Sequence, residues 1–312
     1  MKLQVKFLYF IITLGPIVGF SQIGISNVSE INNIKSGTTF FAMKDPASPK
    51  IAAYVEAIKK NWTLSKVECI KYTDVEKNIA PNNTFVTIGA KMLNANSTGA
   101  TETNFFLEFW TTDGKFVYDP KKRKHFNLDN KILIASVELF SDVTTQNNPS
   151  TLYKMDYDAA GHLRNWSAAI LGNYIQQVVS LLNKGEIRET QTEFLNKTEL
   201  GKLNSQTLYI PDYALTKFSK NSDDESKKYD PKELTEGSGL TCKFITTEEL
   251  NDKIASDTTA FYYLIVIKTN TDKYVTVTNS LTGEIVYSAH SGSPANLKAS
   301  DLKDIQKALQ KK

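Results

Sequence analysis

The sequence predicts an α/β or α+β fold built from two related mixed-sheet modules with hairpin extensions, joined by a long helix. The chain has 312 residues, more than the ~100–200 residues of a single domain. Short apolar strands alternate with amphipathic helices in both halves. In addition, VECIKYTDVEKNIA (67–80) aligns with LTCKFITTEELNDKIA (240–255) if two residues are skipped, which places Cys69 on Cys242. This match predicts an internal duplication, with convergent β-α patterning as the alternative.

Residues 1–21 have the pattern of a bacterial-type signal peptide. Lys2 and Lys6 precede the uncharged stretch 7–20, and the small residues Gly19 and Ser21 are suited to cleavage before Gln22. A helix of that length spans ~21 Å, which is short of a ~30 Å hydrocarbon core. We therefore expect an exported protein, periplasmic or extracellular, that makes no stable membrane insertion after cleavage.

The first module is expected at 37–150, after an Asn- and Ser-rich linker at 22–36. Its strands are short apolar runs at 38–44, 67–72, 84–89 and 132–140. Ser48-Pro49 predicts the start of a helix that ends near Trp62. Asp113-Gly114 is a strong hairpin signal and predicts that 105–110 pairs with 116–118.

A linking segment is expected at 151–186. Within it, apolar residues step by three or four from 159 to 183, which predicts one long helix ended by Gly185.

The second module is expected at 187–312. Its strands are predicted at 207–210, 240–245 and 261–268, and a hairpin is predicted around 281–283. The polar stretch 219–238 is rich in charges and is interpreted as a mobile loop.

Composition excludes several function classes. Lys and Arg number 37 against 34 Asp and Glu, a net charge of +3 that creates no global field for nucleic acid. Neither a G-x-G-x-x-G nor a P-loop motif occurs, so no nucleotide cofactor is predicted. The two cysteines are too few for a disulfide scaffold or a Cys-rich zinc site, and no metal is predicted. They form either one Cys69–Cys242 bridge or two buried free thiols.

His290 is the best candidate for catalysis, because Ser291 and Ser293 follow it in a polar stretch after a strand. No G-x-S-x-G elbow is present to expose a nucleophile, so a polar turn is the alternative interpretation. His125 ends the basic run KKRKH (121–125), which is either a solvated turn or an anion or polysaccharide site.

The candidate ligand-binding residues are Asp45, Asp212 and Tyr213. They follow predicted strands, and α/β sheets bind ligands in loops at the carboxyl ends of their strands. Ordinary turn or helix-start residues are the alternative.

These observations favour an exported, soluble, non-catalytic binding or envelope-associated module of unknown ligand that works without a cofactor. The alternative is a metal-independent hydrolase that uses His290 with a nearby serine. A third hypothesis is an assembly protein, with a protein partner or self-association through exposed hairpins.

Overall fold

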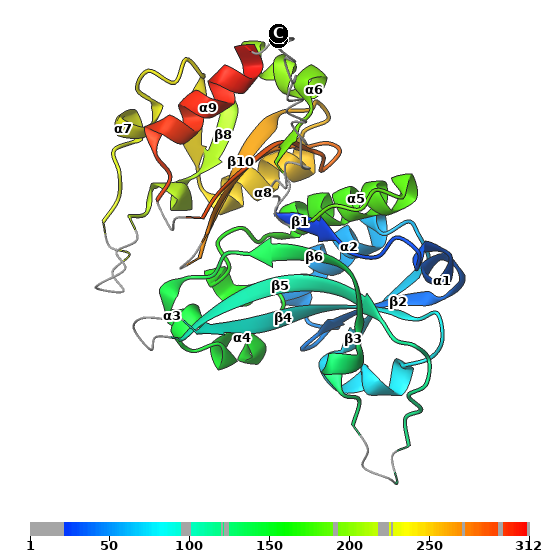
Figure 1. Cartoon of the computed structure of the whole chain (residues 1–312). Coiled ribbons are helices and arrows are strands. Elements are labelled where there is room, and N and C mark those ends of the chain that lie inside the picture. Colours follow the sequence, from blue (N-terminus) through cyan, green and yellow to red (C-terminus); the bar gives the residue numbers. More distant parts are fainter. Residues whose placement is uncertain are drawn as a thin grey trace, which may run out of the picture.

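The computed structural model describes residues 22–94, 101–119, 121, 125–189, 193–217, 225, 227–269, 272–292 and 296–310. The predicted signal peptide lies outside these residues. The chain forms two mixed α/β modules, each built on one six-stranded sheet, as predicted. In Figure 1 the first sheet lies below and the second above, with helix α5 (Ala168–Lys184) between them.

The two sheets have the same topology. The first has the order β1-β6-β5-β4-β2-β3 and the second β7-β12-β11-β10-β8-β9. In each, the strand next to one edge pairs in parallel with both of its neighbours, and the other pairings are antiparallel. The strands of the first sheet are β1 (Ile23–Ile25), β2 (Thr38–Met43), β3 (Lys66–Lys71), β4 (Thr84–Asn94), β5 (Thr101–Thr111) and β6 (Ile132–Leu139). Those of the second are β7 (Phe194–Leu195), β8 (Leu208–Pro211), β9 (Cys242–Ile245), β10 (Tyr262–Lys268), β11 (Lys273–Asn279) and β12 (Ile285–Ser291).

Helices connect these strands at similar places in both modules. The α-helices besides α5 are α1 (Ile31–Ser36), α2 (Ala52–Asn61), α3 (Val143–Asn147), α4 (Ser150–Lys154), α6 (Lys197–Gly201), α7 (Pro231–Thr235), α8 (Thr247–Ser256) and α9 (Ala299–Gln310). The 3-10 helices are η1 (Pro49–Ile51), η2 (Tyr72–Asp74), η3 (Glu76–Asn78), η4 (Leu128–Asn130), η5 (Ala159–Gly161), η6 (Lys202–Ser205) and η7 (Asp212–Leu215).

Strand register supports the alignment of Cys69 with Cys242. In the first sheet Cys69 lies opposite Phe41, and Phe41 lies opposite Val86. In the second sheet Cys242 lies opposite Leu208, and Leu208 lies opposite Tyr262. Both cysteines therefore occupy the same position of equivalent strands, and the rest of each sheet can be aligned from there. Val86 corresponds to Tyr262, and each later residue of β4 corresponds to the next residue of β10.

The two modules pack against opposite sides of helix α5. Helix α5 contacts α2 of the first module on one side and α8 of the second on the other. The Tyr263 hydroxyl, on the face of the second sheet turned toward α5, donates to Asn173 Oδ1 at 2.9 Å. The opposite face lies under α6 and α9, where Lys273 binds the Asp301 carboxylate at 2.7 Å. One apolar core therefore runs through both modules.

Polar contacts reinforce the junction between the sheets. Gln22 is buried beside β1, and its Nε2 donates to the Tyr174 hydroxyl at 2.7 Å. Its Oε1 accepts from Thr276 of β11 at 3.3 Å. The buried Glu138 of β6 accepts a hydrogen bond from the hydroxyl of Tyr274 in β11. Polar side chains of the two modules thus form hydrogen bonds with one another across the junction.

Three predicted segments differ from the structure. The expected linker at 22–36 contains β1, which pairs with β6, and α1. The expected helix at 159–183 begins only at Ala168, because Ala159, Ala160 and Gly161 have positive φ angles and Ser167 caps the helix; Gly185 ends it as predicted. The charged stretch at 219–238 contains α7, where Asp230 accepts from Lys232 N and Pro231 takes the first position.

The hairpin predicted at Asp113-Gly114 is also wrong. Gly114 does turn the chain with a φ of 72°, but 116–118 forms no strand and β5 pairs with β6 instead. Phe116 and Phe126 pack against each other, with ring centroids 5.3 Å apart, on the aromatic cluster of the first sheet. Burial of these rings draws the chain away from β5. The hairpin around 281–283 is confirmed by the pairing of β11 with β12.

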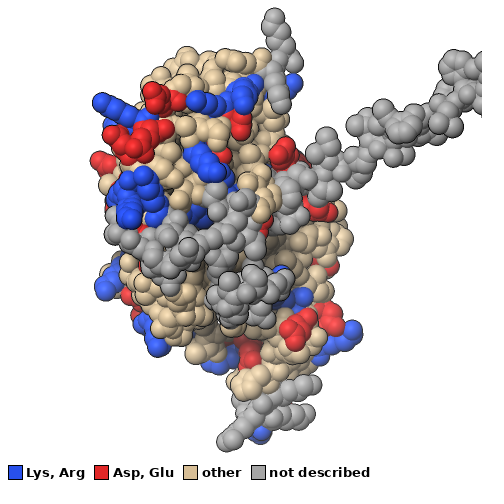
Figure 2. Space-filling view, turned by 60° about the vertical axis from the view of Figure 1, so that its left-hand side comes forward, with Lys and Arg blue, Asp and Glu red and all other residues tan. Residues whose placement is uncertain are grey.

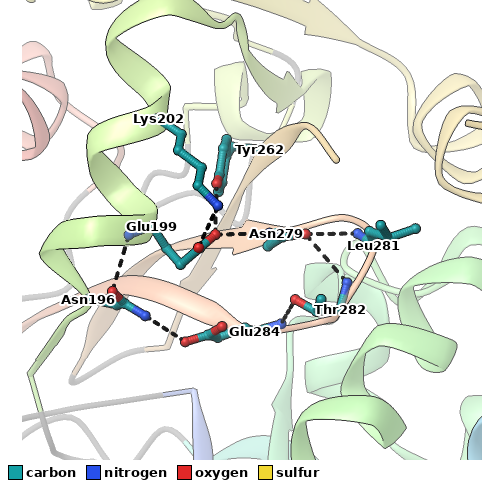
Figure 3. A network of polar contacts seen from close by, with 8 residues as sticks. All are labelled: Asn196, Glu199, Lys202, Tyr262, Asn279, Leu281, Thr282 and Glu284. Atoms are coloured by element: carbon teal, nitrogen blue, oxygen red, sulfur yellow. Dashed lines mark hydrogen bonds and ion pairs between the residues drawn. The ribbon is translucent and has the colours of Figure 1, made fainter. Parts of the chain in front are cut away.

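A polar network holds α6 to the β11–β12 hairpin (Figure 3). The Glu199 carboxylate accepts from Lys202 at 2.6 Å, Tyr262 at 3.2 Å and Asn279 at 3.4 Å. These contacts, with Lys202 foremost, lower the pKa of Glu199. Asn196 caps α6 and also donates to Glu284. Each member is used in fixing the hairpin, so we assign the network a structural role.

Charges of both signs are interspersed on the face shown in Figure 2. This distribution agrees with the small net charge of the chain. Among the described residues, no helix combines the length and apolarity needed to cross a bilayer.

Candidate functional site

A cleft of about 740 Å³ lies where the two modules meet; we call it the junction cleft. The first module contributes α2 and the segment 158–168, and the second contributes the end of β8 and the start of α8. Its lining includes Tyr54, Asp158, Arg164, Trp166, Asp212, Tyr213, Glu248 and Asp252.

Two of the predicted ligand-binding residues, Asp212 and Tyr213, lie in this cleft. They follow β8, whose parallel neighbour β9 ends at Ile245 and leads directly into α8. A capping box between Thr246 and Glu249 begins that helix. The carboxyl ends of these strands therefore open into the cleft, as expected of an α/β sheet.

Asp212 and Tyr213 differ in role. Tyr213 is buried, its ring packs against Phe140 at 5.9 Å, and its hydroxyl accepts from Val266 N at 3.4 Å. Asp212 is only half-buried and lies at the rim. Tyr213 therefore forms part of the cleft wall, while Asp212 places a carboxylate where a ligand can reach it.

Carboxylates dominate the electrostatics of the cleft. Four carboxylates line it: Asp158, Asp212, Glu248 and Asp252. The guanidinium of Arg164 also lies in the lining, but it is bound to Glu225 at 2.8 Å. Burial raises the pKa of Tyr54, and Asp158 and Glu248 raise it further. This effect on Tyr54 reflects a negative potential that reaches the aromatic floor of the cleft.

That floor consists of packed aromatic rings. Tyr54 stacks on Trp166 with centroids 6.0 Å apart and planes 25° apart. Tyr157 meets Trp166 edge-on at 5.3 Å, and Trp166 Nε1 donates to the Tyr157 carbonyl. Trp166 is 4% exposed, so packing on both sides holds the floor rigid. The arrangement combines anionic groups with aromatic rings, the two features that bind organic cations.

Asp45 lies apart from this cleft. It follows β2, and its carboxylate is 4.0 Å from Lys71 Nζ and accepts from Ala47 N at 3.4 Å. It therefore serves a turn, and the structure does not bring it together with Asp212.

His290 is paired with a carboxylate. Its Nε2 lies 2.5 Å from Asp272 Oδ1, and only 5% of its side chain is exposed. Ser291 is the next residue on β12, so its side chain projects to the opposite face of the sheet. Ser293 lies outside the described residues. Among the described residues, then, the neighbouring serine is turned away from the imidazole.

The other histidines also contact carboxylates. His162 Nδ1 lies 2.6 Å from Asp142, which caps α3, and His125 Nδ1 lies 3.1 Å from Glu76. No group of three His, Cys, Asp or Glu able to hold a metal occurs within the part of the chain that the structure describes.

Cys69 and Cys242 are both free, and neither forms the bridge that the sequence left open. Burial raises the pKa of each thiol to about 11. These thiols are therefore protonated and unreactive at neutral pH.

Sequence reasoning missed most of the junction cleft. Asp158, Glu248 and Asp252 come from segments about 90 residues apart in the chain, and only the packing of α2, α5 and α8 brings them together. The one local signal is the acidic first turn of α8, which is typical of helix starts in general.

Comparison with known protein families, characterised proteins and solved structures finds no match for this chain.

Proposed function

We propose that this protein is an exported, non-catalytic binding module that holds an organic cation in the junction cleft. The observation that carries the proposal is the set of four carboxylates around an aromatic floor, where the lining arginine is already bound to Glu225. The predicted signal peptide at residues 1–21 supports export.

The chemistry of the cleft favours a ligand that carries amines. An ammonium group gains from the nearby carboxylates, and the apolar part of such a ligand can rest on the aromatic floor beside them. Glu248 and Asp252 are exposed, so they contribute a salt-sensitive attraction at the rim. Asp158 and Asp212, which are half-buried, are screened less.

Isothermal titration calorimetry with spermidine tests this proposal on the chain from Gln22 onward. We expect binding that weakens by about tenfold or more between 20 and 200 mM NaCl. Absence of heat at millimolar spermidine in low salt would refute cation binding in this cleft.

A double variant locates the site. Asp212→Asn with Glu248→Gln removes two charges and preserves side-chain size, and should weaken spermidine binding by about tenfold or more. The matched control is Asp304→Asn on α9, which loses one exposed ion pair with Lys307 and should leave affinity unchanged. Equal affinities of all three proteins would mean that spermidine binds elsewhere.

Hydrolysis by His290 with a nearby serine is the second candidate function, with Ser293 as the candidate serine because Ser291 is turned away from the imidazole. The contact with Asp272 favours it, because an acid that orients an imidazole is one part of a Ser-His-Asp triad. Screening the protein and its His290→Ala variant on ester, amide and glycoside substrates tests it. Activity that is retained in full by the variant would eliminate His290 as the base.

A further inference from the structure

A second cleft, of about 710 Å³, opens on the face of the first sheet that points away from α5; we call it the open-face cleft. It is bounded by η2 and η3, by β4 and β5, and by Tyr153 of α4. Its lining includes Tyr72, Glu76, Gly89, Glu108, Phe126 and Lys131.

The second module, which has the same sheet topology, shows what this face looks like when it is filled. By register, Thr87 and Gly89 of β4 correspond to Tyr263 and Ile265 of β10. Tyr263 and Ile265 are at most 1% exposed, because that face of the second sheet packs toward α5. In the first module, two small residues stand at these positions and leave a recess.

Gly89 is specifically required for the shape of the recess. A Cβ placed on Gly89 would lie 2.2 Å from Glu108 Oε2, so a side chain there would displace the carboxylate. Glu108 occupies this space and accepts from Lys131 Nζ at 2.6 Å. The ion pair is partly shielded, with side-chain exposures of 17% for Glu108 and 26% for Lys131.

Aromatic rings form the other wall. Phe126 stacks on Trp110 with centroids 5.8 Å apart and planes 5° apart, and Trp110 stacks on Phe85 at 4.7 Å. Trp110 Nε1 donates to Thr87 Oγ1 at 3.0 Å, which orients the indole ring. Tyr153 stands at the rim with 45% of its surface exposed. The wall therefore combines stacked rings with one exposed ring at the rim.

The polar groups of the cleft are close to charge balance. Glu108 is neutralised by Lys131, and Glu76 accepts from Phe126 N at 2.9 Å and contacts His125. A cationic ligand would compete with Lys131, and an anionic ligand would meet both glutamates. A neutral ligand rich in hydroxyls avoids both conflicts, because hydroxyls donate to carboxylates and accept from ammonium groups.

We propose that the open-face cleft binds a neutral saccharide, whose ring packs on the aromatic wall while its hydroxyls bond to the Glu108–Lys131 pair. Sites of this kind combine apolar and aromatic walls with a few placed polar groups. The proposal is independent of cation binding in the junction cleft, which lies on the other side of α2 and the first sheet from this face. His125 lines the cleft, so the C-terminal end of the basic run that the sequence singled out lies at the proposed site.

A panel of neutral pentasaccharides tests the proposal: cellopentaose, xylopentaose, laminaripentaose, maltopentaose and mannopentaose. Calorimetric titration into the chain from Gln22 onward should give a Kd below about 1 mM for at least one of them. If none of the five binds with a Kd below about 5 mM, the proposal is overturned.

Two variants locate the saccharide. Gly89→Ile with Glu108→Thr installs the residues of the second module and should weaken binding by about 20-fold or more. Tyr153→Ala removes an exposed ring and should weaken it by about fivefold with the fold intact. Its matched control is Leu281→Ala, which truncates a similarly exposed apolar residue of the second module, and this variant should bind the saccharide normally.

The outcomes separate the two clefts. Saccharide binding that weakens about fivefold in Tyr153→Ala, with normal binding in Asp212→Asn/Glu248→Gln, supports the open-face cleft even if the Gly89 double variant unfolds. Normal binding in Tyr153→Ala overturns the proposal, since the saccharide would then lie elsewhere.

Discussion

The two modules share one topology and one strand register, yet they use the same sheet face in opposite ways. The second module places Tyr263 and Ile265 on that face and buries them toward α5, whereas the first places Thr87 and Gly89 there and keeps a cleft. The connection after the third strand differs as well. In the second module it is α8, which packs on α5, and in the first it is the short turns η2 and η3. Side-chain volume on one face thus separates a buried interface from an open cleft within the same fold.

The largest expected effect comes from exchanging residues between the modules at this face. Tyr263→Thr removes a buried ring and the bond to Asn173, and should lower the free energy of unfolding by about 3–5 kcal/mol. The reverse exchange, Thr87→Tyr, fills an open recess and loses the bond from Trp110, so it should cost about 1 kcal/mol. Urea denaturation followed by circular dichroism measures both. Equal costs would show that the two faces are not used differently.

A second prediction concerns how closely the second module approaches α5. Gly283 has a φ of 68°, and a Cβ there would lie 2.2 Å from the Asn173 carbonyl oxygen. Gly283→Ala should therefore cost about 2–3 kcal/mol, from both backbone strain and the steric clash. Gly185→Ala is the matched control, because φ is 65° but no atom lies within 4 Å, and it should cost about 1 kcal/mol. Matching costs in thermal and urea denaturation would argue against a tight contact.

A third prediction concerns how the free energy of unfolding depends on pH. It compares a residue near the end of β10 with its counterpart in β4. Lys268 of β10 is 9% exposed and binds Asn296, while its counterpart in β4, Met92, is 67% exposed. Burial lowers the pKa of Lys268 to about 8, so the folded state binds fewer protons than the unfolded state between pH 8 and 10. The titration of Lys268 therefore makes the free energy of unfolding rise with pH in that window.

Lys268→Met, which installs the residue of the first module, should remove that dependence. Relative to the variant, the natural protein should gain about 1 kcal/mol in free energy of unfolding between pH 7 and 9. Cysteine and tyrosine ionisation changes both proteins alike and cancels in the comparison. Parallel curves of unfolding free energy against pH would contradict the burial of a charge-bearing Lys268.

The smallest expected effect concerns the Glu199 network. Its partners Tyr262 and Asn279 correspond to Val86 and Phe109, which are apolar core residues in the first module. The pKa of Glu199 is lowered, so its contribution is present above its ordinary pKa and is lost as pH falls through the lowered value. Glu199→Gln should cost about 1 kcal/mol or less at pH 7, and the cost should shrink steadily as the pH is lowered through the acidic range. A cost that is independent of pH would mean that the charge of Glu199 contributes nothing.

The sequence was informative where local periodicity decides the structure. The match of Cys69 with Cys242 predicted equivalent strands, because two buried strands followed by similar connections leave a readable pattern. Gly185 and the hairpin at 281–283 were correct for the same reason. The turn at Asp113-Gly114 formed, but the aromatic contacts of Phe126 overrode the hairpin that should have followed it.

The candidate sites depended on information that no local pattern contains. Asp212 was found from its place after a strand, whereas Asp158 and Glu248 reach it only through the packing of separate helices. Gly89 resembles any glycine in a strand until β4 is aligned with β10. Only then does its missing side chain stand out as a difference between two modules of the same topology.

The apolar core that continues from one sheet through α5 to the other also limits how the chain can be divided. An amino-terminal half that ends near residue 186 would expose to water the apolar side of α5 that packs on the second module. The remaining half would expose the rings of Tyr263 and Tyr274. The smallest part of this protein expected to fold is therefore the pair of modules, even though each has a complete six-stranded sheet.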